Sequence, residues 1–172
     1  MVAFVAGGTR GGKPMLWLRR LDRFEAEPMP GTENAAKPFW SPDSRWIAFF
    51  SENKLRKVRV SGGTPEPVCD SRYGVGGAWN AEDVIVFASA FGDALYRVPA
   101  SGGQAVKLTT LDAKTRESVH GWPQFFPDGE HFAFLARTAA GVNSVIRIGS
   151  LGAQSTDILM PADALVGVDP AG

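Results

Sequence analysis

Gly7, Gly12 and Lys13 are the residues of this sequence whose spacing most resembles that of a phosphate-binding loop. They fit the pattern G-x-x-x-x-G-K, in which backbone amides and a lysine hold the phosphates of a nucleotide. That chemistry also needs a serine or threonine after the lysine to bind Mg²⁺, and a helix whose N-terminal amides face the phosphates. Pro14 stands where the hydroxyl residue should be. The elements around this segment must therefore decide between a nucleotide site and a glycine-rich turn.

The two histidines, His120 and His131, are the next candidates for chemistry. Two are too few for a metal site built from several histidines, and Cys69, the single cysteine, can form neither an intrachain disulfide nor a cysteine-built metal site. His120 either binds a ligand or bonds to a neighbouring loop or sheet. The second interpretation is favoured because polar groups inside proteins usually have such partners. His131 follows a polar turn and is predicted to face solvent.

Motifs of the common catalytic sites are missing from the 172 residues. The sequence has no G-x-S-x-G nucleophile elbow, no H-R-D catalytic loop and no D-F-G. Acids and arginines recur evenly along the chain instead of gathering into one cluster. We therefore predict no catalytic residue, no metal ligand and no cofactor, and we expect a role other than catalysis.

Composition narrows the choice of partners. The 18 basic and 18 acidic residues cancel, which argues against a nucleic acid or an anionic membrane as the main partner. No apolar run approaches the roughly 20 residues of a membrane helix, and residues 1–20 lack the pattern of a signal peptide. We expect no direct membrane insertion by these residues, and both cytosol and periplasm are compatible with the sequence.

An internal repeat organises the elements that would have to position any site. Three segments begin with an aromatic residue, continue as a polar turn with an acid and end as an apolar strand: "PFWSPDSRWIAFF" (38–50), "GAWNAEDVIVFA" (77–88) and "PQFFPDGEHFAFLA" (123–136). Their aromatic residues, Trp40, Trp79 and Phe125, are 39 and 46 residues apart. The acids Asp43, Glu82 and Asp128 follow at the same intervals and are predicted to shape the turns, as is Asp169 near the end of the chain.

The repeated unit contains four short strands and predicts a β-propeller. Each apolar strand is followed by a variable loop, a third strand that carries an arginine, a small-residue turn and a fourth extended piece. Four antiparallel strands about every 40 to 45 residues are typical of propeller blades. The expected fold is an all-β array of four units, at about 1–43, 44–83, 84–129 and 130–172. These units form either a closed four-bladed ring or an arc of a larger propeller, whose open blade edges would allow self-association.

The repeat also assigns roles to the candidate residues. "MVAFVA" aligns with the second strand of a unit, so segment 7–14 is predicted to be a hairpin loop. Trp40, Trp79 and Trp122 could form an aromatic binding floor or fill the wedges between blades, and together with His120 they are the candidate interaction residues. One arginine per unit shares the phase of the repeat: Arg20, Arg59, Arg97 and Arg147. A ring of these arginines could attract an anion, although the favoured interpretation is a solvated outer face.

Two segments, "WSPDSRWIAFF" and "FFPDGEHFAFL", resemble the TolB-like, WD-related propeller repeat of bacteria. Longer stretches, among them "LYRVPASGGQAVKLTTLD" and "HGWPQFFPDGEHFAFLAR", resemble the C-terminal propeller of bacterial receptor-type serine/threonine protein kinases. The turn "NAED" departs from the Pro-Asp pattern of the repeat. In that kinase family a cytoplasmic kinase domain precedes a membrane helix, and the propeller acts outside the cytoplasm as a sensor or interaction module.

The resemblance leaves two classes of function open. One is a sensor or interaction module that binds a protein or a small ligand. The other is an accessory propeller, because similar repeats occur before the catalytic domain of prolyl-oligopeptidase-type hydrolases, or a scaffold like TolB itself. The neighbouring coding sequence separates them: kinase motifs and a membrane helix upstream favour the sensor, and a G-x-S-x-G domain downstream favours the hydrolase.

Overall fold

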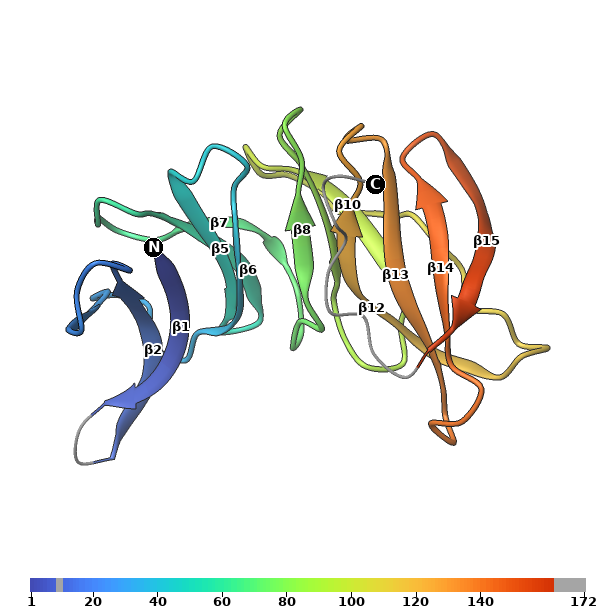
Figure 1. Cartoon of the computed structure of the whole chain (residues 1–172), viewed down its shortest axis with the longest axis horizontal. Coiled ribbons are helices and arrows are strands. Elements are labelled where there is room, and N and C mark those ends of the chain that lie inside the picture. Colours follow the sequence, from blue (N-terminus) through green and yellow to red (C-terminus); the bar gives the residue numbers. More distant parts are fainter. Residues whose placement is uncertain (9–10, 163–172) are drawn as a thin grey trace.

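The computed structural model describes residues 1–8 and 11–162, and the regular structure in this part of the chain is entirely β-strand. Four antiparallel sheets follow one another along the chain (Figure 1). Within these residues there is no helix that could cross a membrane. The prediction of an all-β array of propeller blades is confirmed.

The first two sheets cover the N-terminal half of the chain. The first has three strands in the order β1 (Val2–Gly8), β2 (Gly12–Arg19), β3 (Ala26–Pro28). The second has four strands in the order β4 (Ala36–Trp40), β5 (Trp46–Ser51), β6 (Lys54–Arg59), β7 (Glu66–Asp70). In both sheets the strands pair in sequence order, as expected for a chain that folds back at short turns.

The third and fourth sheets repeat this pattern. The third is built from β8 (Gly77–Trp79), β9 (Val84–Ala88), β10 (Leu95–Pro99), β11 (Val106–Lys107). The fourth is built from β12 (Glu117–Phe125), β13 (His131–Thr138), β14 (Val145–Ser150), β15 (Ala153–Pro161). The repeat therefore marks real blades, with the first sheet beginning at the second strand of its unit.

The glycine-rich segment near the N-terminus is a hairpin connection. β1 and β2 pair antiparallel, Gly8 faces Gly12, and Lys13 lies inside β2. Because the residues after Gly12 form a strand, this lysine is not followed by a helix whose amides could bind phosphates. The hairpin prediction is confirmed.

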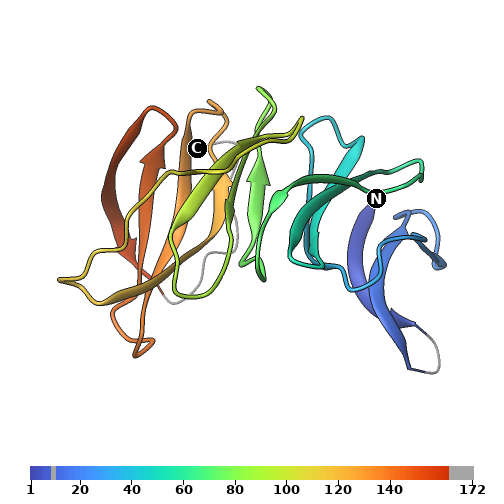
Figure 2. The ribbon, with the colours of Figure 1, turned by 180° about the vertical axis from the view of Figure 1, so that it is seen from behind.

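The sheets lie side by side in an arc. Figures 1 and 2 show the first sheet at one end and the fourth at the other. Neighbouring sheets meet through their first strands, since β4 contacts β8 and β8 contacts β12. The backbone joins the third and fourth sheets as well: the amide of Trp122 donates to Val75 O at 2.9 Å, and the amide of His120 donates to Asp93 O at 3.0 Å. Among the described residues, the arrangement is thus an open arc and not a closed ring.

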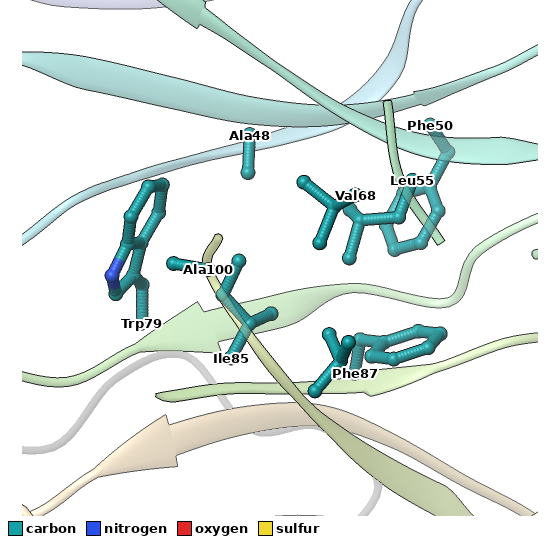
Figure 3. Packing of buried hydrophobic residues seen from close by; sticks show 9 residues of the cluster. Ala48, Phe50, Leu55, Val68, Trp79, Ile85, Phe87 and Ala100 are labelled. Carbon is teal, nitrogen blue, oxygen red and sulfur yellow. The ribbon is translucent and has the colours of Figure 1, made fainter. Parts of the chain in front are cut away.

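Apolar residues fill the space between successive sheets. The second strands supply the largest share of them, because these strands are covered on both faces and read as nearly continuous apolar runs. Figure 3 shows the cluster between the second and third sheets: Ala48, Phe50, Leu55, Val68, Trp79, Ile85, Phe87, Ala100. Further clusters join the first sheet to the second and the third to the fourth. The blades are therefore held by side-chain packing between sheets.

Antiparallel order places the connections on two opposite rims. The turn rim comprises the short connections within blades on one side, for example residues 41–45, 80–83 and 126–130 at the top of Figure 1. The loop rim comprises the connections on the other side. These are the loops between second and third strands (52–53, 89–94, 139–144) and those that lead to the next blade (29–35, 71–76, 108–116).

Candidate functional site

The acids of the turn rim bind the chain's own backbone. Asp43 Oδ1 accepts from Ser41 Oγ at 2.6 Å and from the amide of Arg45 at 3.0 Å. The hydrogen bond from Ser41, followed by that from the amide of Arg45, lowers the pKa of Asp43 below its usual value. Asp128 accepts from the amides of Glu130 and His131, and its second oxygen lies 2.7 Å from His131 Nδ1. Both carboxylates are thus committed to shaping their turns.

The turn between β8 and β9 uses an asparagine instead. Asn80 Oδ1 accepts from the amides of Glu82 and Val84, at 3.2 and 2.8 Å, while Asn80 Nδ2 donates to Gly129 O of the fourth sheet at 2.8 Å. The structure therefore places the amide acceptor of this turn two residues before Glu82. The Glu82 carboxylate instead lies beside Gly129 of the next blade. Asp169, the fourth predicted turn acid, lies outside the described residues.

The loop rim has two adjoining hollows over the second and third sheets. One, of about 680 Å³, lies between the β5–β6 turn and the β7–β8 loop. The other, of about 380 Å³, extends to the β9–β10 loop and has an aromatic wall. The two share three lining residues, Asp70, Arg72 and Ser89. Tyr73 and Phe91 project from the same loops with 72% and 67% of their surface exposed, so aromatic side chains border both hollows.

Ser89 fixes the loop that carries Arg72. Its carbonyl oxygen accepts from the amides of Tyr73 and Gly74, and its hydroxyl accepts from the amide of Arg72 at 3.3 Å. Gly74 has φ +63°, and a Cβ at this position would overlap the ring of Phe50. Only glycine allows so close an approach in this conformation. The backbone around Arg72 is therefore anchored to the third sheet, whereas its side chain reaches solvent.

The acids around these hollows already have partners. Lys54 Nζ lies 2.7 Å from Asp70 Oδ1. Asp93 accepts from the hydroxyl of Tyr96 at 2.9 Å and lies 3.5 Å from Lys107 Nζ. Burial, followed by this hydrogen bond, raises the pKa of Tyr96, so the phenol remains a donor near neutral pH.

Arg72 differs from these residues, because it forms no ion pair with any other residue that the structure describes.

Beneath the loop rim, a polar cluster is buried between the third and fourth sheets. Glu117 and His120 have 2% and 1% of their side-chain surface exposed, and His120 Nε2 lies 2.9 Å from Glu117 Oε2. Arg147 Nε donates to Glu117 Oε1 at 2.8 Å. His120 Nδ1 lies 2.8 Å from Thr109 Oγ1, which also accepts from the amide of Leu95. The cluster is therefore a continuous chain of hydrogen bonds that joins two blades.

The hydrogen bonds assign the protons of this cluster. An ionised Glu117 can only accept, so His120 Nε2 carries the proton that it donates, and His120 Nδ1 accepts from the hydroxyl of Thr109. Burial lowers the pKa of His120 and keeps the imidazole neutral. Burial alone would raise the pKa of Glu117, but hydrogen bonds from the Asp112 amide, His120 and Arg147 outweigh it and lower the pKa.

The three predicted interaction tryptophans lie in separate wedges. Trp40 packs on the cluster between the first and second sheets, Trp79 on that between the second and third, and Trp122 on that between the third and fourth. His120 is fully buried, in the internal hydrogen-bonded position that was the favoured interpretation. The structure therefore does not bring these four residues together. His131 faces solvent beside Asp128, with 52% of its side chain exposed.

The four arginines do not share one position. A common reference for the three sheets is the second-strand residue that pairs with the aromatic residue of the first strand: Ile47 opposite Trp40, Ile85 opposite Trp79, Phe132 opposite Phe125. Arg59 pairs with the residue before this reference, and Arg97 with the residue after it. Arg147 pairs with the second residue after it. Because side chains alternate between the faces of a strand, Arg147 points to the opposite face from the other two and becomes buried. Arg20 lies just after β2 and pairs with Asp22. The prediction of a common phase is wrong.

Sequence reasoning missed Arg72, Ser89 and Glu117. Arg72 and Glu117 lie outside the repeated positions, so comparison of the units could not find them. Ser89 aligns with Ser51 of the preceding unit, and this recurrence does not mark it as a site residue. The only available signal was the variation of the loops themselves, because loops that differ while the scaffold repeats are where binding residues concentrate. The described residues contain no group of His, Cys, Asp and Glu side chains that could hold a metal ion.

Comparison with known proteins places the fold. No model of a known protein family matches the chain. An uncharacterized protein of Agrobacterium fabrum is 30% identical over 116 residues, covering 57% of this chain and 38% of that protein. The chain thus spans well under half the length of this relative.

The similarity to solved structures covers more of the chain than the similarity in sequence does. A TolB-like protein of Agrobacterium tumefaciens has a TM-score of 0.74 at 14% identity, over 91% of this chain and 59% of that one. An ancestral GH74 enzyme has a TM-score of 0.66 at 13% identity, over 98% and 27%. Regucalcin, a calcium-binding protein of A. tumefaciens, has a TM-score of 0.53 at 14% identity, over 74% and 43%. At these identities the likeness establishes the β-propeller fold alone.

Proposed function

We propose that the chain is a sensor or interaction module without catalytic activity, which binds a protein or a small ligand through its loop rim. The observation that carries this proposal is a difference in how the two rims use their polar side chains, since hollows occur on both rims. On the turn rim, Asp43, Asn80 and Asp128 bind backbone groups of the chain. On the loop rim, two adjoining hollows meet at Arg72, with exposed aromatic side chains beside them.

The proposal includes a parent protein: a bacterial receptor-type serine/threonine kinase, in which the module would lie outside the cytoplasm. The support for this part is the sequence resemblance over most of the chain, together with a fold that fits it. The flanking coding sequence tests it. An H-R-D and D-F-G kinase domain and a membrane helix upstream are expected, whereas a G-x-S-x-G domain downstream would overturn the kinase assignment in favour of a propeller that gates a hydrolase.

A pair of matched substitutions tests which rim binds. Phe91→Ser removes an exposed aromatic ring from the loop rim, and Phe24→Ser removes one from the turn-rim connection between β2 and β3, where Phe24 is 93% exposed. Ligands found by thermal-shift screening of peptides and small molecules should lose their effect with Phe91→Ser and keep it with Phe24→Ser. The opposite pattern would show that the turn rim is the binding face.

Self-association is a further part of the proposal. β1 and β15 are edge strands of their sheets, and β15 exposes Ile158, Leu159 and Met160. Exposed edges with apolar side chains favour pairing with another chain. Light scattering after size-exclusion chromatography should show a mass that rises with protein concentration, and a constant monomer mass would contradict this part.

A further inference from the structure

The smaller hollow of the loop rim has the size and lining of a ligand pocket. Its volume of about 380 Å³ falls at the small end of the range for ligand sites, roughly 300 to 1,000 Å³. The lining combines the guanidinium of Arg72 with aromatic rings and polar side chains. It includes Arg72, Ser89, Phe91, Asp93, Tyr96 and Phe87. We call this hollow the Arg72 pocket.

The charges around the Arg72 pocket leave one cation uncompensated. Asp70 is held by Lys54 at 2.7 Å, and Asp93 is held by the hydroxyl of Tyr96 and by Lys107. In the adjoining hollow, Glu52 is held by Arg56 at 2.7 Å. Each nearby carboxylate therefore has a basic partner, and Arg72 adds a positive charge for which the described residues supply no carboxylate.

Hydrogen bonds hold in place the backbone that carries the Arg72 side chain. The amides of Tyr73 and Gly74 donate to Ser89 O at 2.9 and 3.1 Å, and Ser71 Oγ donates to the same oxygen at 3.4 Å. A ligand that binds Arg72 would therefore not have to order this loop first, which reduces the entropic cost of binding. A planar guanidinium presents two parallel N–H groups, which match the two oxygens of a carboxylate.

Part of the remaining wall of the pocket is apolar. The rings of Phe87 and Tyr96 lie 6.0 Å apart between centroids, Ala105 lies beside them, and Phe91 projects from the β9–β10 loop. Such a wall stabilises an apolar group through burial, at roughly 25 cal/mol per Å² of apolar surface. A ligand that uses the whole pocket must carry an apolar group beside its anionic group.

We propose that the Arg72 pocket binds a carboxylate attached to an apolar group, with the carboxylate on the guanidinium of Arg72 and the apolar group against Phe91 and Tyr96. This inference rests on the proposed function, because it assigns a ligand chemistry to the loop rim. Two sources present this chemistry: the C-terminus of a peptide that ends in an apolar residue, and a free apolar carboxylic acid.

The experiment uses ligands that differ only in charge. Amide signals of the ¹⁵N-labelled chain are followed by NMR during titration with N-acetyl-phenylalanine and with N-acetyl-phenylalaninamide. The acid should shift the signals of residues 71–73 and 89–93, and the amide should bind about tenfold more weakly, since a hydrogen bond to a charged group contributes on the order of 1.5 kcal/mol or more. A pentapeptide ending in phenylalanine, with a free or an amidated C-terminus, tells the two sources apart: tighter binding of the free-ended peptide than of the acid assigns a peptide terminus, and the reverse assigns a free acid.

Variants separate the charge effect from changes in folding. Arg72→Gln should weaken binding of the acid about tenfold and leave the weak binding of the amide unchanged. Arg45→Gln, which removes an exposed arginine of the turn rim, should change neither. Equal binding of acid and amide, or an unchanged affinity in a folded Arg72→Gln protein, would overturn the inference. Loop-rim ligands found by thermal shift would still support the proposed function in that case, so the two failures are distinguishable.

Discussion

The two rims of the arc are made by the same strands and yet use polar residues in opposite ways. On the turn rim, the side chains of Ser41, Asn80 and Asp128 occupy related positions and bind amides of the following residues. On the loop rim and in the buried cluster beneath it, charged residues such as Arg72 over the second and third sheets and Glu117 between the third and fourth lie outside the repeated positions. The difference shows that repetition marks a shared structural task, the closing of a hairpin, and that the departures from repetition mark what is particular to this chain.

The largest expected effect is the loss of unfolding free energy when a buried carboxylate, and not an exposed one, is removed. Glu117→Gln removes the charge that compensates the buried Arg147, and breaking a buried pair costs about 3 to 5 kcal/mol, so we expect the free energy of unfolding to fall by about 3 kcal/mol. Asp70→Asn, at an exposed pair with Lys54, should cost less than about 0.5 kcal/mol. Urea denaturation at pH 7 measures both. Similar losses for the two variants would remove the distinction between the buried cluster and the surface.

A second prediction tests the structural role of the turn rim. Asn80→Ala deletes hydrogen bonds to Val84, Glu82 and Gly129, the last of which joins two blades. Because the backbone groups left behind are partly buried, the expected loss of unfolding free energy is about 2 kcal/mol. Ser41→Ala, whose hydroxyl bonds stay within one blade, should cost about half as much. A loss for Asn80→Ala no larger than that for Ser41→Ala would contradict the role of Asn80 between blades.

Acid should weaken the buried cluster before it affects the turns. The folded state lowers the pKa of His120 from 6.5, so below about pH 6.5 the unfolded chain takes up a proton that the folded chain does not. The stabilisation from a neutral His120 is complete above pH 6.5 and is lost as the pH falls, with a slope of at most about 1.4 kcal/mol per pH unit for one proton. Glu117, whose pKa is also lowered, adds a further loss below about pH 4.5.

The variant His120→Gln separates these two contributions. It should abolish the decrease between pH 6.5 and 5 while the decrease at lower pH persists, as measured by urea denaturation across this range. If the wild-type protein showed no change in unfolding free energy between pH 8 and 5, the assignment of a buried, neutral imidazole to His120 would be wrong.

The smallest expected effect concerns the exposed rings. Phe91→Ser and Phe24→Ser remove side chains that contribute little to the core, so each should change the unfolding free energy by less than about 0.5 kcal/mol. Phe91 would then affect binding without affecting stability, as expected for a loop-rim residue. A loss above about 1.5 kcal/mol for Phe91→Ser would mean that its loop is part of the core.

Much of the fold could be predicted from the sequence because local rules determine it. The apolar runs around Phe49, Phe87 and Phe134 lie in second strands as predicted, and the glycines near Lys13 close a hairpin. The candidate site could not be predicted in the same way. Whether an arginine points outward depends on register, and a shift of one residue sent Arg147 inside.

The residues that form the buried cluster could not be predicted for a related reason. Glu117, His120 and Arg147 lie on β12 and β14, and Thr109 comes from the loop after β11. Folding of the fourth sheet brings Glu117, His120 and Arg147 together across β13, and docking of the third and fourth blades adds Thr109. No sequence spacing reports these contacts. The same holds for the Arg72 pocket, whose walls come from two sheets.

Hydrogen–deuterium exchange of the chain with and without a ligand found by thermal shift tests the central claim most directly. A functional loop rim predicts slower exchange of the amides in residues 71–76 and 89–94, with residues 41–45 and 80–83 unchanged. Slower exchange on the turn rim, with the loops over the second and third sheets unaffected, would contradict the assignment of the two rims.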